Sequence, residues 1–435
     1  MKLTISSWIE KYRVILANAG SLVGSTAITS GLGFIYWWLA ARQFPPEAVG
    51  LGSAAISAMM FLGNVSVLGF GTLLIGELPR QPGREGSLIS TALFLVGMTG
   101  GTLGLFFALV APWVSADLWV LAENIGNTSL FALGVSLTAV TLVTDQAMVG
   151  LLRSDLQLGR NTIFAMTKLI ALIIVGLWMT QKLGLSIYAT WLGGNIASLA
   201  ILAGYGAWKN NNKAHSYKPK WNLLHKLGST ALGHHVLNLT LQASGLLMPI
   251  IVTAVLSARM NAYFYTSWMI ASFATVVSVA LTTVLYAVGS ADPAALATKI
   301  RLTLRLSVLA GVLTSIALLV GADFVLGLFK PAYAGQAGLS LRILGLAVFP
   351  LIAKNHFVVI RRIHNQIIST AWWMMAGGVL ELTLAATGAR LGGLAGLSLG
   401  WVAAMCIEAL FMVRTIYQVA MPAPLSNSLP AVPSS

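Results

Sequence analysis

Residues 209–226, KNNNKAHSYKPKWNLLHK, form the longest polar stretch of this 435-residue chain and lie near its middle. Apolar segments flank this stretch on both sides, at residues 187–208 and 227–256. A helix that spans a membrane needs about 20 mostly apolar residues, and irregular backbone facing lipid is not tolerated. The flanking segments therefore predict two membrane-spanning helices joined by a polar connection.

The same criterion, applied outward from this connection, predicts six spans on each side of it. The protein is therefore expected to be all-α and polytopic, with twelve membrane-spanning helices in total. The predicted spans are residues 14–39, 48–76, 88–111, 127–150, 161–180, 187–208, 227–256, 263–288, 302–322, 339–360, 368–388 and 393–413.

The composition of the chain agrees with a membrane protein and excludes several classes of soluble protein. Hydrophobic residues make up 57% of the chain and charged residues 9%, with a mean hydropathy of +0.83. Soluble globular chains carry about a quarter charged residues. A soluble enzyme, a disordered chain and a nucleic-acid-binding domain are therefore excluded, and no nucleic-acid partner is expected despite the net charge of +14.

The net charge follows the connections between spans. Alternate connections contain eighteen Lys and Arg against five acidic residues, whereas the other connections contain five against four. Because basic connections stay on the cytoplasmic side, this pattern places both termini in the cytoplasm. The basic connections are residues 1–13, 77–87, 151–160, 209–226, 289–305, 361–367 and the tail from Arg414.

A weak internal repeat suggests two lobes of six helices each around a central cleft. An offset of 217 residues places Arg42 on Arg259, Ser21 on Asn238 and Ser25 on position 242. Because six spans return the chain to the same side, the two lobes should be related by a pseudo-twofold axis along the membrane normal. The predicted divisions are an N-terminal lobe (1–208), a linker (209–226), a C-terminal lobe (227–414) and a cytoplasmic tail (415–435).

Polar side chains form a stripe on one face of spans 1 and 7. Polar residues at membrane depth face either a cavity or a neighbouring helix, so the stripes indicate either the wall of a cleft or hydrogen bonds between helices. A pair of titratable histidines in the stripe could bind phosphate or pass a proton. The stripe residues are Asn18, Ser21, Ser25 and Thr29 on span 1, and His234, His235, Asn238 and Gln242 on span 7.

Six charged residues lie inside the predicted spans. An unpaired charge in hydrocarbon costs several kcal/mol, so pairing is expected, although Lys168 and Lys354 are also candidates for binding an anionic headgroup. The pairs that residue depth predicts are Lys354 with Glu408, Arg342 with Glu381, and Asp145 with Lys168.

The sequence predicts neither an enzyme nor a metal centre. It contains no motif typical of hydrolases, nucleotide-binding proteins or histidine metal sites, and its one cysteine, Cys406, lies in an apolar stretch. Tyr36 and Trp37 are expected in the aromatic belt at the membrane interface. The alternative interpretation is that their rings form a platform on which a sugar stacks.

Three segments resemble the oligosaccharide-lipid and polysaccharide flippases of the superfamily shared with multidrug-and-toxin exporters. They are NAGSLVGSTAITSGLGFIYWWLAARQFPPEAVGLGSAAISA (18–58), LGFGTLLIGELPR (68–80) and TDQAMVGLLRSDLQLGRN (144–161). The resemblance implies alternating access that moves a polyprenyl-diphosphate-linked oligosaccharide from the inner to the outer leaflet of the plasma membrane. It also implies glycosyltransferases and a glycan polymerase as partners, beside membrane lipids.

The chain departs from one subgroup of these flippases. Transporters of the peptidoglycan precursor carry an Arg-Asp pair in span 1 shortly after a Gly-Phe, where this chain has Tyr36 and Trp37. No cofactor is expected, and coupling to protons or sodium is left open. The alternatives are a cation-coupled multidrug-type exporter and, from another class, a non-transporting membrane component or a ligase of glycan assembly.

Overall fold

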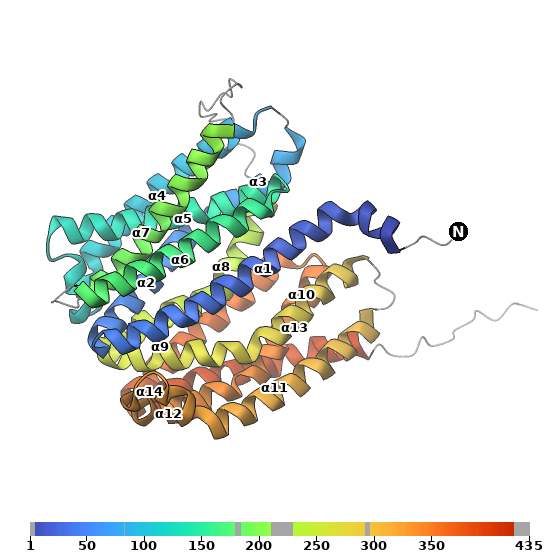
Figure 1. Ribbon diagram of the computed structural model, residues 1–435. Coiled ribbons are helices and arrows are strands. Elements are labelled where there is room, and N and C mark those ends of the chain that lie inside the picture. The colour runs from blue at the N-terminus through green and yellow to red at the C-terminus, as the bar shows by residue number, and fades with distance from the viewer. Residues whose placement is uncertain (1–4, 82, 179–183, 210–228, 292–295, 422–435) are drawn as a thin grey trace, which may run out of the picture.

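Every regular element in the described part of the chain is a helix. The computed structural model describes residues 5–81, 83–178, 184–209, 229–291 and 296–421 (Figure 1). Most of the predicted linker and tail lie outside these residues. The helices of the first half are α1 (Ile5–Gln43), α2 (Pro46–Ser66), α3 (Phe70–Glu77), α4 (Glu85–Val114), α5 (Ile125–Gly150), α6 (Ser154–Trp178) and α7 (Gly184–Lys209).

The second half repeats this helical arrangement. Helix α8 packs along α14, while α11 packs on α12 and α10. The helices are α8 (Ser229–Val255), α9 (Ala258–Ser272), α10 (Val276–Ala291), α11 (Leu296–Gly327), α12 (Pro331–Leu346), α13 (Val348–Ile363) and α14 (Ile367–Ala420).

The number of membrane crossings agrees with the prediction. Ten helical stretches of the described residues are long and apolar enough to cross a membrane. One of them, α14, is 54 residues long and contains non-helical backbone at Gly392 and Gly393, so it counts as two crossings. The 39-residue helix α1 supplies the twelfth.

Three predicted spans are broken rather than continuous. The span predicted at residues 48–76 divides into α2 and α3, because Leu68 and Gly69 have left-handed backbone angles with φ of 52° and 83°. Glycine adopts this conformation without steric cost. The spans predicted at 263–288 and 339–360 likewise divide into α9 with α10, and α12 with α13.

Helix α14 folds back on itself as a tight hairpin. A Cβ atom placed on Gly396 would lie 2.2 Å from the carbonyl oxygen of Gly388, and one on Gly400 would lie 2.1 Å from that of Leu384. The backbones of the two halves therefore touch, as small residues allow in helix packing. Gly393, with φ of 59°, makes the turn.

The hairpin yields a stability prediction. Gly396→Ala should lower the free energy of unfolding by about 1–3 kcal/mol, because the new methyl group has no room against the facing backbone. Gly378→Ala, on the same helix, is the control, since its Cβ would meet nothing within 4 Å. Thermal unfolding in detergent should show a loss only for Gly396→Ala, and equal midpoints for the two variants would contradict this packing.

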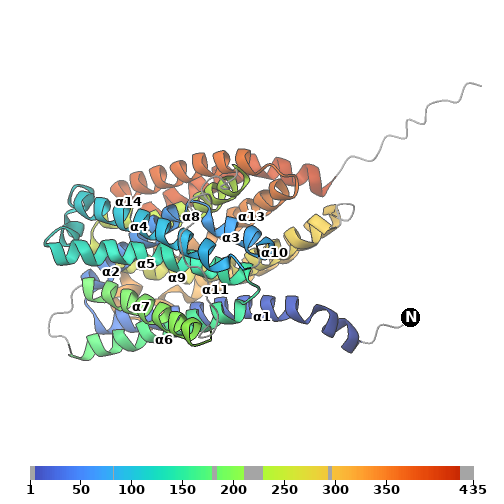
Figure 2. The ribbon, with the colours of Figure 1, turned by 90° about the horizontal axis from the view of Figure 1, so that it is seen from above.

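The two lobes meet at one end and diverge toward the other. We call the end of the molecule that carries the basic connections the inner end, and the opposite end the outer end. Figure 1 shows the lobes spreading toward the end where the N-terminus of α1 lies, and Figure 2 shows this N-terminus from above. The principal contacts between lobes join α2 to α8 and α9.

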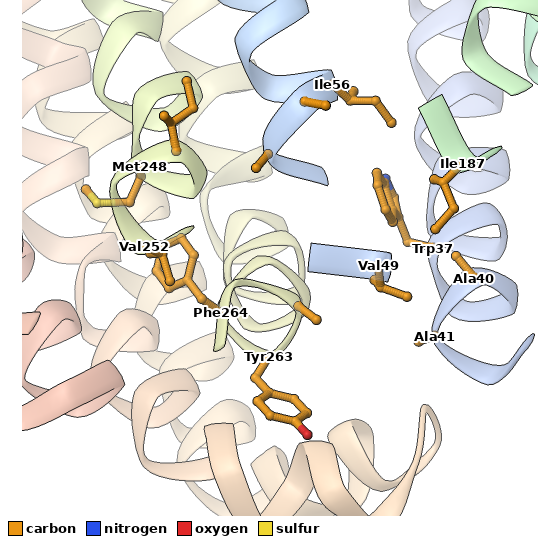
Figure 3. Close-up of a cluster of buried hydrophobic side chains, with 14 of the residues drawn as sticks. Trp37, Ala40, Ala41, Val49, Ile56, Ile187, Met248, Val252, Tyr263 and Phe264 are labelled. Atoms are coloured by element: carbon orange, nitrogen blue, oxygen red, sulfur yellow. The ribbon is translucent and has the colours of Figure 1, made fainter. Parts of the chain in front are cut away.

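One apolar core joins both lobes at the outer end. It includes Trp37 and Val49 of the first lobe and Met248, Val252 and Phe264 of the second, all of them buried (Figure 3). Burying apolar surface contributes about 25 cal/mol per Å², so this shared core holds the outer ends together. The space between the lobes therefore opens toward the inner end.

Candidate functional site: one cavity in each lobe

The first lobe contains a cavity of about 410 Å³ between α1, α2, α6 and α7. Its wall is polar toward the inner end and aromatic toward the outer end. No carboxylate is among its described lining residues. They are Ser25, Thr26, Thr29, Gly33, Trp37, Met60, Gln157, Asn161, Phe164, Lys168 and Trp191.

Lys168 of α6 is the one cation that lines this cavity among the described residues. Its ammonium nitrogen lies 3.8 Å from the ring centroid of Trp191, 4.6 Å from that of Phe164 and 5.1 Å from that of Tyr36. The residue is 4% exposed. At 1.5 Å per residue, it lies about 21 Å along α6 from Ser154, which is near the middle of a membrane.

The predicted pair of Asp145 with Lys168 is wrong. Asp145 of α5 instead accepts two hydrogen bonds of 2.7 Å from Arg160 of α6. The short turn between α5 and α6 brings these residues to the same depth, and a guanidinium matches both oxygens of a carboxylate. Asp145, the acidic residue predicted near this cavity, is therefore already paired, and no carboxylate of a described residue pairs with Lys168.

The α1 stripe extends along this cavity. Ser25 is buried and its hydroxyl accepts a 3.0 Å hydrogen bond from the amide of Asn161 on α6. Thr29 lines the same wall. Ser21 is half-buried, whereas the side chain of Asn18 lies outside the described residues. The stripe thus supplies both a hydrogen bond between helices, at Ser25, and part of the cavity wall, at Thr29.

Tyr36 and Trp37 are buried inside the protein rather than exposed on its surface as residues of an interfacial belt would be. Tyr36 has no exposed surface, and its hydroxyl hydrogen bonds to Thr190 (2.7 Å) and to the carbonyl of Ile187 (3.1 Å). It therefore offers no free face to a sugar. Trp37 lines the cavity and packs on Tyr265 of the second lobe, with 4.7 Å between ring centroids.

The second lobe contains its own cavity, of about 260 Å³, between α8, α9, α12, α13 and α14. Lys354 and Glu381 line it. The predicted pairing of Lys354 with Glu408 is confirmed at 3.0 Å, and Lys354 also donates a hydrogen bond to Glu381. Because two carboxylates hold Lys354, it is less available to an anionic headgroup than Lys168.

The predicted pair of Arg342 with Glu381 is wrong. Arg342 of α12 instead binds Asp323 at the end of α11, at 2.8 Å, and the carbonyl of Leu319. Glu381 lies on the opposite side of the lobe's interior, where Lys354 reaches it first. Agreement in depth predicted the partner incorrectly because it does not specify the face of the helix.

The α8 stripe lies beside the inner end of α13. Asn238 and Gln242 are exposed, and the amide oxygen of Asn238 accepts a 2.7 Å hydrogen bond from Arg362. His234 also lies near Arg362, and His235 lies against the backbone of Val65 on α2. The stripe therefore follows the seam where the two lobes approach each other.

The two arginines that the internal repeat aligned have matching positions. Arg42 of the first lobe donates hydrogen bonds of 2.9 and 3.1 Å to the carbonyl of Leu328 in the second lobe. Arg259 of the second lobe pairs with Glu47 of the first. Each arginine thus reaches into the opposite lobe at the outer end, although the two partners, Leu328 and Glu47, lie in different elements.

Sequence reasoning missed Arg160 and Arg362. Arg160 was assigned to an inner connection because the predicted span began one residue later, and Arg362 because it follows a predicted span. The available signal for Arg160 was its position: fifteen residues after Asp145, across a tight turn, at the same depth. For Arg362 the chain offers no local signal, because its partner Asn238 is 124 residues away.

No family model and no curated protein matches the sequence. Solved structures do match its fold. An inward-facing multidrug resistance MATE family transporter of the MOP superfamily matches with a TM-score of 0.72, 14% identity, and coverage of 92% of this chain and 99% of that one. An outward-facing conformation of a MATE family transporter of the MOP superfamily matches with a TM-score of 0.61 and 13% identity, over 94% of this chain and 96% of that one.

A third solved structure comes from Pyrococcus furiosus and is a MOP superfamily transporter. It matches with a TM-score of 0.60 and 13% identity, over 94% of this chain and 96% of that one. The chain is therefore a multi-pass membrane protein with the two-lobed fold of MOP superfamily transporters.

Proposed function

We propose that the protein is a plasma-membrane flippase that moves a polyprenyl-diphosphate-linked oligosaccharide from the inner to the outer leaflet during synthesis of surface polysaccharide. The observation that carries the proposal is Lys168, a buried cation without a carboxylate partner in the cavity of the first lobe. A buried charge of this kind marks a substrate pathway when no structural partner neutralises it.

The charge of this cavity favours an anionic substrate. The aromatic rings around Lys168 stabilise an ammonium by about 2 kcal/mol or more when it is desolvated, but they supply no negative charge. A diphosphate would supply it through charge-assisted hydrogen bonds. The hydroxyl of Thr29 and the amides of Gln157 and Asn161 on the same wall could hydrogen bond to sugar hydroxyls.

The shape of the molecule suits uptake from the inner side. The lobes are joined at the outer end by the contacts of Arg42 and Arg259, and both cavities lie on the inner side of those contacts. We place both termini in the cytoplasm on the distribution of basic residues. The solved structures that share the fold include inward-facing and outward-facing conformations, which supports alternating access as the mechanism.

The main alternative is a cation-coupled exporter of small organic cations. Such a substrate would meet Lys168 as a like charge, whereas Asp145, the acid that the sequence placed nearest to Lys168, is already bound by Arg160. The MOP superfamily transporter of Pyrococcus furiosus is described as having a binding pocket of reversed polarity that suggests a different function. In this chain the described wall of the first-lobe cavity contains a lysine and no carboxylate. For this reason we favour an anionic substrate.

The proposal is tested by measuring how tightly the purified protein binds a fluorescent polyprenyl-diphosphate oligosaccharide, and how fast it flips this lipid in liposomes. Lys168→Met should weaken binding roughly 10- to 100-fold, the loss expected for a charge-assisted contact, and flipping should fall with it. Lys168→Arg should retain part of the affinity because it keeps the charge.

Arg301→Met is the matched control, because Arg301 is an exposed cation at the inner end of α11 and lines neither cavity. It should bind and flip the lipid like the unmodified protein. Unchanged binding by Lys168→Met would refute the proposal. If Lys168→Met instead gained affinity for a cationic dye that the unmodified protein already exports, the multidrug-type alternative would replace it.

A further inference from the structure

Two carboxylates converge on one lysine inside the second lobe. Lys354 of α13 lies 3.0 Å from Glu408 in the second half of α14, and it donates a hydrogen bond to Glu381 in the first half. Lys354 is 8% exposed, Glu381 1% and Glu408 7%. The hairpin of α14 brings the two carboxylates together, although they are 27 residues apart in the sequence.

The two carboxylates differ in how well their oxygens are satisfied. One oxygen of Glu381 accepts the hydrogen bond from Lys354, and the other accepts a 2.8 Å hydrogen bond from the indole nitrogen of Trp401. Glu408 has its ion contact with Lys354, but neither of its oxygens accepts a hydrogen bond from a described residue. Glu381 is thus stabilised as an ion by two donors, whereas the contact with Lys354, which Glu408 shares with Glu381, is what stabilises Glu408 as an ion.

The net charge of the cluster also favours protonation of one carboxylate. With all three groups ionised, the cluster of Lys354, Glu381 and Glu408 carries one excess negative charge in the membrane interior. An uncompensated buried charge costs several kcal/mol, and a single proton removes this cost. The other charged group near Glu408 among the described residues is Arg361, across a cavity, and α8 presents the uncharged Ser244 to Glu381.

Space and access are available at Glu408. It lines a cavity of about 270 Å³ that also contains Arg361 and Thr415, near the inner ends of α13 and α14. Lys354 and Glu381 line the separate cavity of the second lobe. A Cβ at Gly377 would lie 2.6 Å from the carboxyl of Glu408, so only glycine there leaves room for this group. The cluster therefore stands between two cavities.

We propose that Glu408 is a proton-binding site that couples proton movement to transport. A proton from water in the 270 Å³ cavity adds to an oxygen of Glu408. The neutral carboxyl of Glu408 can then donate a hydrogen bond to Glu381, with which Glu408 is in contact. On release the proton passes from Glu408 to Glu381, which lines the cavity of the second lobe, and from Glu381 to water in that cavity. The two protonation states differ by one buried charge, so they favour different arrangements of the α14 hairpin. This inference rests on the proposed transport function.

The test is infrared difference spectroscopy of the full-length protein in lipid, as the pH is varied without substrate. A protonated carboxylic acid has a carbonyl stretch that an ionised carboxylate lacks. The unmodified protein should show this band, and Glu408→Gln should lose it. Asp145→Asn is the matched control: Asp145 is also buried, but Arg160 neutralises it one to one, so its removal should leave the band unchanged.

Two further variants test the charge balance. Glu381→Gln removes the excess negative charge, so Glu408 should become ionised beside Lys354 and the band should disappear. Lys354→Met leaves two carboxylates without a cation, so the band should grow. Retention of the full band in Glu408→Gln would overturn the assignment. Loss of the band on adding a sodium salt at constant pH would overturn it in favour of a metal cation.

The infrared test of Glu408 does not depend on which substrate the protein transports. Lys168→Met should keep the band, because Lys168 lies in the other lobe. If the lipid is not flipped but the band behaves as described, the proposed function fails and the proton site stands. If the lipid is flipped and imposing a pH gradient changes the rate equally in the unmodified protein and Glu408→Gln, the proton site fails alone.

Discussion

Asp145→Ala is expected to lower the free energy of unfolding by about 3–5 kcal/mol, the cost of leaving one partner of a buried ion pair without the other. Arg160 would remain as a buried guanidinium whose remaining contacts are with Asn161 and Ser198. The side chain of Arg160 is 5% exposed, so water cannot replace the carboxylate. Chemical unfolding in detergent, followed by circular dichroism, would measure the loss.

The double variant Asp145→Ala with Arg160→Met distinguishes the net contribution of the ion pair from the cost of leaving Arg160 without a partner. Replacing both charges with apolar groups removes the uncompensated ion, so the double variant should be more stable than Asp145→Ala alone. Asp155→Ala is the control, because Asp155 of α6 forms an exposed pair with Arg153. Its loss should be below about 1 kcal/mol. Equal losses for Asp145→Ala and Asp155→Ala would contradict the burial of the first pair.

Gly50→Val is expected to open the outer end of the protein. A Cβ atom on Gly50 would lie 1.6 Å from the carbonyl oxygen of Ala258, so any side chain there forces α2 away from α9. Overpacking costs about 1–3 kcal/mol. Since this cost falls only on the state with the outer end closed, it should shift the balance between conformations by about 5- to 150-fold.

The shift can be measured by labelling a buried position from outside. Ala262 of α9 has no exposed surface in this structure, so Ala262→Cys in a Cys406→Ser background should resist a membrane-impermeant maleimide. Adding Gly50→Val should raise labelling several-fold. Gly204→Val is the control, because a Cβ there meets nothing within 4 Å. If both glycine variants label alike, close packing at Gly50 does not keep the outer end closed.

The contact at Gly50 is one of several contacts that hold the two lobes together at the outer end. Asn261 of α9 donates hydrogen bonds to the carbonyl of Gly50 (2.8 Å) and to the hydroxyl of Ser53 (3.1 Å). Asp117, in the connection after α4, accepts a hydrogen bond from the backbone of Ala258. All of these bonds would have to break for a substrate to leave outward.

The number and order of the crossings could be predicted from the sequence alone, although several helices begin before the predicted bounds, for example α6 at Ser154 rather than 161 and α12 at Pro331 rather than 339. Length and hydropathy decide the number and order, because a bilayer requires about 20 apolar residues per crossing regardless of their neighbours. The resemblance in residues 18–58 and the offset that paired Arg42 with Arg259 also agree with the fold. The interruptions at Leu68 and at the junctions after α9 and α12 were not predicted, since their segments are uniformly apolar.

The partners of the buried charges were decided by tertiary structure. Residue depth correctly paired Lys354 with Glu408, because both lie in helices that pack together. It failed for Asp145 and Arg342, because depth does not determine which face of a helix a side chain occupies. The distinction between Lys168, which lacks a carboxylate, and Lys354, which has two, became visible only in the folded chain.

What the sequence determined by itself is that the chain crosses a membrane twelve times, with basic connections on one side, because both properties depend on local composition. What only the tertiary structure decided is the sign of the charge that each lobe turns toward its cavity. That sign depends on which carboxylates reach which cations. Asp145 reaches Arg160 rather than Lys168 because the short turn after α5 places Arg160 against it, and the predicted depths alone did not distinguish these two cations.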